Sequence, residues 1–358
     1  MASSSDSPLR ILAGPTALRH VREHGLHLAD IDVLVGAAGG AKFLMLAGLD
    51  RVLFSALAEA PRERPIHCVG ASIGSWRLAC LACARPAAAI DRLAEAYLGE
   101  RRYRPRAPVR AVEAIRDDLL SATFDGESAT AIAEHPSVRL HVLASRTSRS
   151  ARRDGRKRLA LRLGFAAMGN LLSRRTLGWQ FQRAVFHSRG EAGPLAGIED
   201  LPTSHLRLDG SNLRAALSAS AALPFVMDAV PVGGVKGLYR DAGLLDYNPV
   251  FAYRPGPGLV LYPHYFDYLT PGWFDRSLRS RRVGPSALDR TILLAPSESF
   301  VRRLPGGARP RRADFSRFDD RERERRWRAV WAASAELGVA LGELLASGRA
   351  SALVRPFP

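Results

Sequence analysis

Chemistry could begin at Ser72, which stands between two glycines in the G-A-S-I-G stretch of residues 70–74. The preceding residues 65–70, PIHCVG, form a short apolar run that predicts a buried strand, and the residues after Ser72 predict a helix. A serine on a sharp turn between a strand and a helix can present its hydroxyl as a nucleophile. The same pattern also fits an ordinary serine that caps a helix, so the motif alone leaves both interpretations open.

A glycine-rich turn could supply hydrogen-bond donors to the reaction of such a serine. Residues 36–42, GAAGGAK, follow the apolar run 31–35, which predicts another buried strand, and lead into an apolar helix. Free N–H groups at a turn of this kind bind anions, including the oxyanion formed when an ester is attacked. A phosphate loop fits less well, because Lys42 is followed by Phe43 where that motif requires Ser or Thr.

A serine hydroxyl also needs a base. Asp241 follows the strand-like residues 235–240 and comes two residues before Gly243, in a turn that could point a carboxylate into a cleft. A carboxylate bonded to the serine could act as the base without histidine. Two alternatives are an aspartate that only forms the turn, and Asp246 as the base in its place.

A histidine-dependent triad is another possibility. His264 follows both aspartates in the chain, so the order Ser, Asp, His of the α/β-hydrolase triad is present, with Asp241 or Asp246 as the acid. Because nine histidines make such a match easy to obtain by chance, His264 is better explained as a residue at the end of a strand or on the surface.

The charge of the chain suggests an anionic partner. The net charge is +17, and only three of the 52 basic residues are lysines, so part of this charge can reflect coding bias toward arginine. Arg-rich loops at 146–158 and 302–313 could bring the protein into peripheral contact with an anionic membrane. No helix-turn-helix, RNA-binding signature or zinc finger is evident, so we expect no specific nucleic acid partner. A non-catalytic protein that binds anionic lipid is the rival from another functional class.

The sequence also indicates the cellular compartment of the protein. The N-terminus lacks a signal-peptide pattern, and no segment reads as about 18 consecutive apolar residues. The three cysteines (Cys68, Cys80 and Cys83) lie in apolar surroundings without a second pair to complete a zinc site, which predicts reduced thiols and no metal. We expect a cytoplasmic protein that can also lie at a membrane surface.

Strands and helices alternate along the chain, which predicts an α/β layered fold. The amphipathic stretch 158–172 and its surroundings suggest a cap-like insertion at about 147–190, although a plain surface helix with a basic flank is the alternative. The expected strands are 31–35, 65–70, 138–146, 204–208, 258–262 and 290–294, and the expected helices include 15–25, 211–222 and a long one at 320–347.

Three of these stretches together resemble the patatin-like phospholipases, or lipid acyl hydrolases. That family carries a G-G-G-x-[RK]-G loop, a G-x-S-x-G motif about thirty residues later, and a D-G-[AG] turn. Here the serine motif at 70–74 is complete, and residues 216–226 are similar to the Ser/Ala-then-Pro block that precedes the family's aspartate. Departures from the pattern are Ala38 and Phe43 in the loop and Ala242 in the aspartate turn, where alanine requires a negative φ.

The resemblance, which spans residues 31–262, implies a three-layer α/β/α fold with a mixed, mostly parallel sheet. Residues 1–265 would form the catalytic domain, and 266–358 a C-terminal helical extension packed on it. The implied activity is hydrolysis of carboxylic esters of lipids, of the phospholipase A or lysophospholipase type, through an acyl-enzyme and without a cofactor. A catalytically inactive relative could keep the same skeleton. The implied site has Ser72 as nucleophile, Asp241 as base, the amides of Gly39, Gly40, Ala41 and Ile73 as the oxyanion hole, and Lys42, Gly70, Gly74 and Gly243 as motif support.

Overall fold

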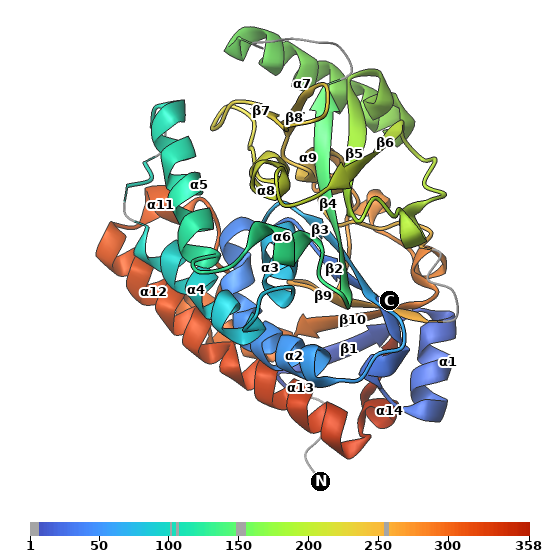
Figure 1. Ribbon diagram of the computed structural model, residues 1–358. Coiled ribbons are helices and arrows are strands. Elements are labelled where there is room, and N and C mark those ends of the chain that lie inside the picture. The colour runs from blue at the N-terminus through green and yellow to red at the C-terminus, as the bar shows by residue number, and fades with distance from the viewer. Residues whose placement is uncertain (1–6, 101, 105–106, 148–154, 254–257) are drawn as a thin grey trace.

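A single mixed sheet forms the centre of the molecule (Figure 1). The computed structural model describes residues 7–100, 102–104, 107–147, 155–253 and 258–358. Strands run in the order β11-β1-β10-β9-β2-β3-β4-β5-β6, with β8 paired to β4 and to β7 off this path. Their bounds are β1 Leu9–Ala13, β2 Ile31–Gly36, β3 Ile66–Ala71, β4 Val138–Thr147, β5 Phe181–Ser188, β6 Thr203–Leu208, β7 Val230–Pro231, β8 Leu238–Arg240, β9 Leu259–Pro263, β10 Thr291–Pro296 and β11 Arg355–Pro356.

The inner strands are parallel. Pairs β10–β9, β9–β2, β2–β3 and β3–β4 run in the same direction, whereas β1–β10 and β4–β5 are antiparallel. Every residue of β2 is buried, as a continuous apolar run in a covered parallel sheet should be. The expected strands in β2, β3, β4, β6, β9 and β10 are confirmed, and together with the helices they make the three-layer α/β/α fold.

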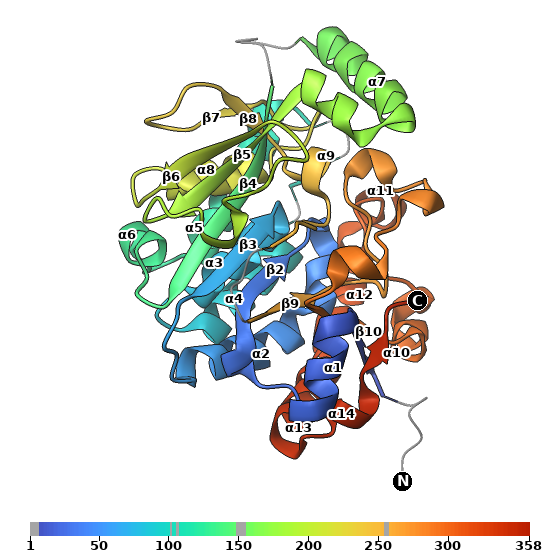
Figure 2. The ribbon, with the colours of Figure 1, turned by 90° about the vertical axis from the view of Figure 1, so that its right-hand side faces the viewer.

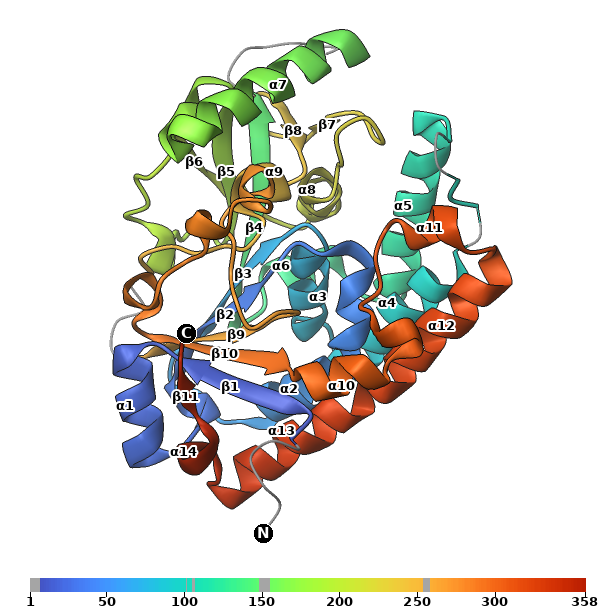
Figure 3. The ribbon, with the colours of Figure 1, turned by 180° about the vertical axis from the view of Figure 1, so that it is seen from behind.

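Helices α2, α3 and α4 pack beside one another, and α12 and α13 run along them (Figures 1 and 3). Helices α1 and α14 lie against β1, next to the β11 edge of the sheet (Figures 2 and 3). The helices are α1 Pro15–His24, α2 Ala47–Glu59, α3 Ile73–Leu81, α4 Pro86–Gly99, α5 Val109–Thr123, α6 Ala129–Ala133, α7 Arg156–Leu172, α8 Leu213–Ser220, α9 Gly243–Asp246, α10 Glu298–Arg303, α11 Asp314–Arg317, α12 Asp320–Ala333, α13 Ala335–Ser347 and α14 Ala350–Leu353.

The expected cap at 147–190 is wrong over its last part. Residues 181–188 form β5, which pairs with β4 and β6 inside the sheet. The pattern was misleading because Arg183 lies in the middle of this strand yet is fully buried, between the carboxylates of Asp200 and Asp246. Among the described residues of this range, the helix α7 and the short 3₁₀ turn Arg174–Trp179 lie outside the sheet. The Arg-rich loop at 146–158 falls largely outside the described residues.

The C-terminal segment is part of the same sheet. Strand β10 lies between β1 and β9, so the segment 266–358, expected as an extension packed on the catalytic domain, also contributes a strand to the central sheet. By length and hydropathy alone, Asp320–Ser347 could cross a membrane, contrary to the sequence expectation. In the fold it packs along α2, where the amide of Gly48 donates to Ser334 Oγ at 2.8 Å. These contacts assign it to the helical layer of the domain.

The three cysteines are buried free thiols, as expected. Burial raises the pKa of Cys68 and of Cys83 to about 12. Neither thiol therefore has the low pKa of a reactive cysteine.

Candidate active site

Ser72 lies at the sharp turn between β3 and α3. Its backbone has φ 54° and ψ −128°, which is a strained conformation for a residue with a side chain. The turn needs glycine next to it, because a Cβ on Gly74 would lie 2.2 Å from the carbonyl oxygen of Gly36 in β2. Helix α3 is also anchored by the buried ion pair of Arg77 with Asp50 in α2, at 2.7 Å for both hydrogen bonds. The strand, turn and helix predicted around Ser72 are therefore present.

The Ser72 hydroxyl donates a hydrogen bond to Oδ2 of Asp241 at 2.8 Å. Both side chains are buried. The other carboxylate oxygen, Oδ1, accepts the amide N–H of Gly243 at 2.7 Å. Ala242 between them has φ −60°, so the family's middle glycine is replaced here without strain.

The charge state of Asp241 reflects two opposing effects. Burial raises the pKa of its carboxyl to about 6, while the Ser72 hydroxyl, the Gly243 amide and the positive charge of Arg312 act in the other direction. At neutral pH the carboxylate is therefore ionised, although its proton affinity is higher than that of an exposed aspartate. A carboxylate of this kind can accept a proton from a serine.

Ser220, at the end of α8, forms hydrogen bonds to both the Ser72 turn and the Asp241 turn. Its Oγ accepts the backbone N–H of Ser72 at 2.9 Å and lies 3.0 Å from Ser75 Oγ. Its carbonyl oxygen accepts the amide of Ala242 at 3.0 Å. No sequence signal marked Ser220 itself as a site residue, although it lies within the 216–226 block that is similar to the family pattern.

The glycine-rich turn leads into a 3₁₀ helix, Gly40–Met45. Gly40 has φ +55°, the left-handed region that favours glycine. The amides of Gly40 and Ala41 open this helix and that of Ile73 opens α3, positions where N–H groups have no acceptor within their own helix. All three residues line the same cavity as Ser72. Gly39 lies beside them with its Cα against the ring of Tyr265.

The remaining loop departures also have structural explanations. The amide of Ala38 donates to the carbonyl of Tyr247 at 2.9 Å, so an alanine fits there. Phe43 is fully buried and packs edge-on against the ring of Tyr97, with ring centres 5.3 Å apart. Lys42 reaches back to the carbonyl of Gly39 at 3.4 Å, and burial together with Arg276 and Arg309 lowers its pKa to about 8.

The cavity next to Ser72 is mostly apolar. Its volume is about 140 Å³, and apolar side chains from α3, α5, the 221–227 loop and α11 form its wall: Trp76, Val112, Ile115, Leu119, Leu223, Val226, Met227 and Phe315. Arg116, Arg312 and Glu100 add polar groups to this wall. Leu223 and Val226 lie in the 216–226 block, but the other residues are distant in sequence and carry no local motif, so the sequence did not indicate that they line the site.

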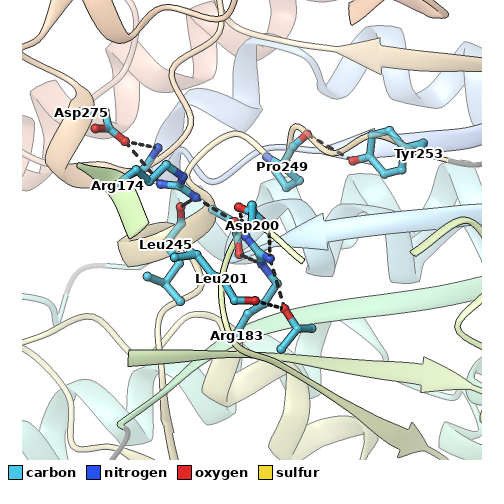
Figure 4. A network of polar contacts seen from close by, with 11 residues as sticks. Arg174, Arg183, Asp200, Leu201, Leu245, Pro249, Tyr253 and Asp275 are labelled. Atoms are coloured by element: carbon cyan, nitrogen blue, oxygen red, sulfur yellow. Dashed lines mark hydrogen bonds and ion pairs between the residues drawn. The ribbon is translucent and has the colours of Figure 1, made fainter. Parts of the chain in front are cut away.

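The candidate triad does not assemble in the described structure. Nε2 of His264 lies 2.9 Å from Asn248 Nδ2, and its Nδ1 lies 2.9 Å from the carbonyl oxygen of Phe266, so both ring nitrogens have partners other than Ser72. Asp246 accepts two hydrogen bonds from Arg183, each at 2.8 Å. Figure 4 shows the polar contacts of Arg183, including those with Asp200. Asp241 is hydrogen-bonded to Ser72, whereas the described polar partners of His264 and Asp246 are other residues.

Comparison with curated proteins and with solved structures found no match. The sequence model of the patatin-like phospholipases matches residues 34–252, a range that includes the glycine-rich loop, the Ser72 turn and the Asp241 turn. The match covers more than half of the 358 residues, and the chain therefore belongs to the patatin-like phospholipase family.

Proposed function

We propose that the protein is a serine acyl hydrolase that cleaves carboxylic esters of lipids. Membership of the patatin-like phospholipase family suggests lipid acyl hydrolase activity. The observation that carries the proposal is the 2.8 Å hydrogen bond from Ser72 Oγ to a buried Asp241, at the wall of an apolar cavity. Ser72 is the proposed nucleophile and Asp241 the proposed base.

The proposed reaction has two halves. In the first, Ser72 Oγ forms a bond to the ester carbonyl carbon while its proton passes to Asp241. The amides of Gly40, Ala41 and Ile73 stabilise the negative oxygen of the tetrahedral intermediate, with the neighbouring Gly39 amide as a further candidate donor. The bond to the leaving alcohol then breaks, and the alcohol takes the proton from Asp241. In the second half, water repeats these steps on the acyl-enzyme and releases the fatty acid.

The lining of the cavity supports a lipid substrate. Its apolar wall suits an acyl chain, which would be buried next to the carbonyl that Ser72 attacks. The two arginines suit a phosphate on the same molecule. The Arg116 side chain is only 10% exposed, and its Nη2 pairs with Asp117. Its Nη1 is buried without a hydrogen-bond partner among the described residues. Arg312 is exposed and donates to the hydroxyl of Tyr103 at 3.0 Å. We therefore favour phospholipase A or lysophospholipase activity.

Fatty-acid release from a lysophospholipid, a diacyl phospholipid and a neutral monoacylglycerol tests the proposal. Ser72→Ala should lower release from every substrate by about 1,000-fold or more. Arg116→Gln should raise KM for the two phosphate-bearing lipids and leave the neutral ester unchanged. If Ser72→Ala keeps wild-type turnover, the hydrolase proposal is wrong. If Arg116→Gln affects all three substrates equally, the arginine does not select phosphate.

A further inference from the structure

Helix α7 has a stripe of large apolar side chains on its outer surface. The exposed fractions are 62% for Leu161, 65% for Phe165, 67% for Met168 and 86% for Leu172, and Leu171 beside them is 63% exposed. The spacing of the four stripe residues is that of one helix face. Exposed large apolar residues are few elsewhere in the described structure, so their concentration on one helix calls for an explanation.

The packing of α7 shows that this stripe is not its core face. The buried residues of the helix are Leu159, Leu163, Ala166 and Asn170. They precede the exposed residues by two positions, which is about 200° around a helix at about 100° per residue. The inner stripe packs with Leu177, Phe181, Leu201, Leu244 and Leu245 in a separate apolar cluster. The helix is therefore apolar on two opposite faces, and the domain covers only one of them.

Polar contacts fix the orientation of α7. Asn170 Nδ2 donates to Oδ1 of Asp275 at 2.7 Å, and Arg281 donates to the carbonyl of Asn170 at 3.0 Å. Just beyond the helix, Arg174 bonds to the carbonyl of Leu245 at 2.6 Å and reaches Asp275 (Figure 4). Because these contacts hold the inner face of α7 against the domain, the outer stripe faces away from the protein.

The charges around the stripe favour an anionic surface. Residues 156–181 include no aspartate or glutamate. Lys157 and Arg158 are exposed at the start of α7, and Arg175 is exposed after its end, close in sequence to Trp179, which is 75% exposed. Apolar residues flanked by lysine, arginine and tryptophan are typical of helices that lie in the interface of a bilayer.

The same helix is adjacent to the rim of the active-site cavity. Arg156 Nη2 lies 3.4 Å from the carbonyl oxygen of Phe225, whose side chain is 40% exposed. The next two residues, Val226 and Met227, line the cavity that contains Ser72. None of the described cavity-lining residues belongs to α7, so the helix borders the cavity without closing it.

We propose that the outer face of α7 (Leu161, Phe165, Met168, Leu171 and Leu172), together with Trp179, docks on the surface of an anionic lipid bilayer. The helix lies in the plane of the membrane, its apolar stripe enters the acyl-chain boundary, and Lys157, Arg158 and Arg175 contact lipid phosphates. Lipid at the membrane surface then lies next to the cavity rim at Phe225. Only this last step, delivery of substrate, rests on the proposed function; the docking does not.

Vesicle binding of the full-length protein with Ser72→Ala, which prevents turnover of the lipid, tests the docking. Sedimentation with phosphatidylcholine vesicles that contain about one third phosphatidylglycerol should show binding, and added salt or pure phosphatidylcholine should weaken it. The variants Phe165→Glu and Leu172→Glu should each lower the affinity about tenfold or more, because each removes an apolar anchor and adds a negative charge.

Val339→Glu is the matched control. Val339 is 61% exposed, but it lies on α13, at the end of the molecule opposite α7 (Figures 1 and 3). This variant should bind vesicles like the parent protein. Equal vesicle binding by the parent protein, Phe165→Glu and Leu172→Glu would overturn the proposal. The proposal would also be overturned if the parent protein does not bind vesicles but forms a dimer that these two variants dissociate. The stripe would then be an interface between two copies of the chain.

A second readout separates this proposal from the proposed function. In chains that retain Ser72, Phe165→Glu and Leu172→Glu should keep wild-type turnover of a water-soluble ester and lose turnover of vesicle lipid. Vesicle binding without turnover of either substrate would sink the hydrolase proposal and leave the docking surface standing.

Discussion

Asp241 shares its two carboxylate oxygens between two donors, the hydroxyl of Ser72 at 2.8 Å and the amide of Gly243 at 2.7 Å. The side chain is nevertheless buried, and its proton affinity is raised. The two bonds orient the carboxylate, while burial keeps it basic enough to accept a proton. This combination leads to opposite predictions for activity and for stability.

Replacement of Asp241 by asparagine should stabilise the protein while abolishing activity. The folded-state pKa of about 6 exceeds the ordinary value of 3.8. For a carboxyl group this difference favours folding below pH 3.8, and the gain is lost as pH rises to about 6. At pH 7 the charged group therefore costs up to about 3 kcal/mol, at about 1.4 kcal/mol per pKa unit.

Urea unfolding at pH 7 measures this effect. Asp241→Asn should raise the free energy of unfolding, and the difference from wild type should shrink as pH falls to 4. A less stable Asp241→Asn at pH 7 would contradict the buried-charge interpretation.

The activity should depend on ionisation of the same carboxyl. Below about pH 6, kcat/KM for a water-soluble ester should fall about tenfold per pH unit, because protonated Asp241 cannot accept the serine proton. Above pH 6 the profile should level off. If kcat/KM instead begins to fall only near pH 4, the ordinary range of an exposed aspartate, a different group acts as the base.

Gly40→Ala should impair catalysis through the backbone of the glycine-rich loop. A Cβ at this position has room, since its nearest neighbour is Tyr97 Oη at 3.7 Å, but φ +55° is unfavourable for alanine by about 1–2 kcal/mol. Relief of that strain should turn the amides of Gly40 and Ala41 away from the cavity. We expect kcat to fall about 100-fold or more.

Gly126→Ala is the control for Gly40→Ala. Gly126 also has a positive φ, +72°, with nothing within 4 Å of its Cβ position, and it is not among the cavity-lining residues. Both variants should lose similar stability in thermal unfolding, but only Gly40→Ala should lose kcat. Similar kcat values for the two would remove the loop from the proposed mechanism.

Buried neutral histidines should make the fold sensitive to acid. Burial lowers the pKa of His187 to about 3, and its neighbours His67 and His205 act in the same direction. A depressed histidine pKa means that stability is complete above the ordinary value of 6.5 and is lost as pH falls toward 3. The slope is about 1.4 kcal/mol per pH unit for each such group.

Urea unfolding between pH 7 and 5 tests this sensitivity. His187→Gln should flatten the dependence relative to wild type. If His187→Gln and wild type lose stability in parallel, His187 is not the group that titrates.

Local features of the site were predictable because their residues are close in the chain. The G-x-S-x-G turn requires a strand, close glycines and a helix within about ten residues, and these are present around Ser72. Ser220 and the α5 wall of the cavity could not be found in the same way. They meet Ser72 only through the packing of α8 and α5, which no local pattern specifies.

The errors in the fold have similar causes. Strand β5 contains Arg183, and its burial is compensated by the ion pairs with Asp200 and Asp246, which come later in the chain. Strand β1 is a short apolar run beside a polar N-terminus. It forms a strand because it pairs with β10, which lies nearly three hundred residues later in the chain. For α7 the helix was predictable, but the sequence did not indicate which of its two apolar faces packs on the domain.

Labelling with a fluorophosphonate probe measures most directly whether Ser72 is an activated nucleophile with Asp241 as its base. We expect wild type and His264→Gln to be labelled, and Ser72→Ala and Asp241→Asn to remain unlabelled, with all four shown to be folded by circular dichroism. Labelling that survives Asp241→Asn but disappears in His264→Gln would contradict the Ser–Asp pair, and a folded wild type that is never labelled would contradict the hydrolase itself.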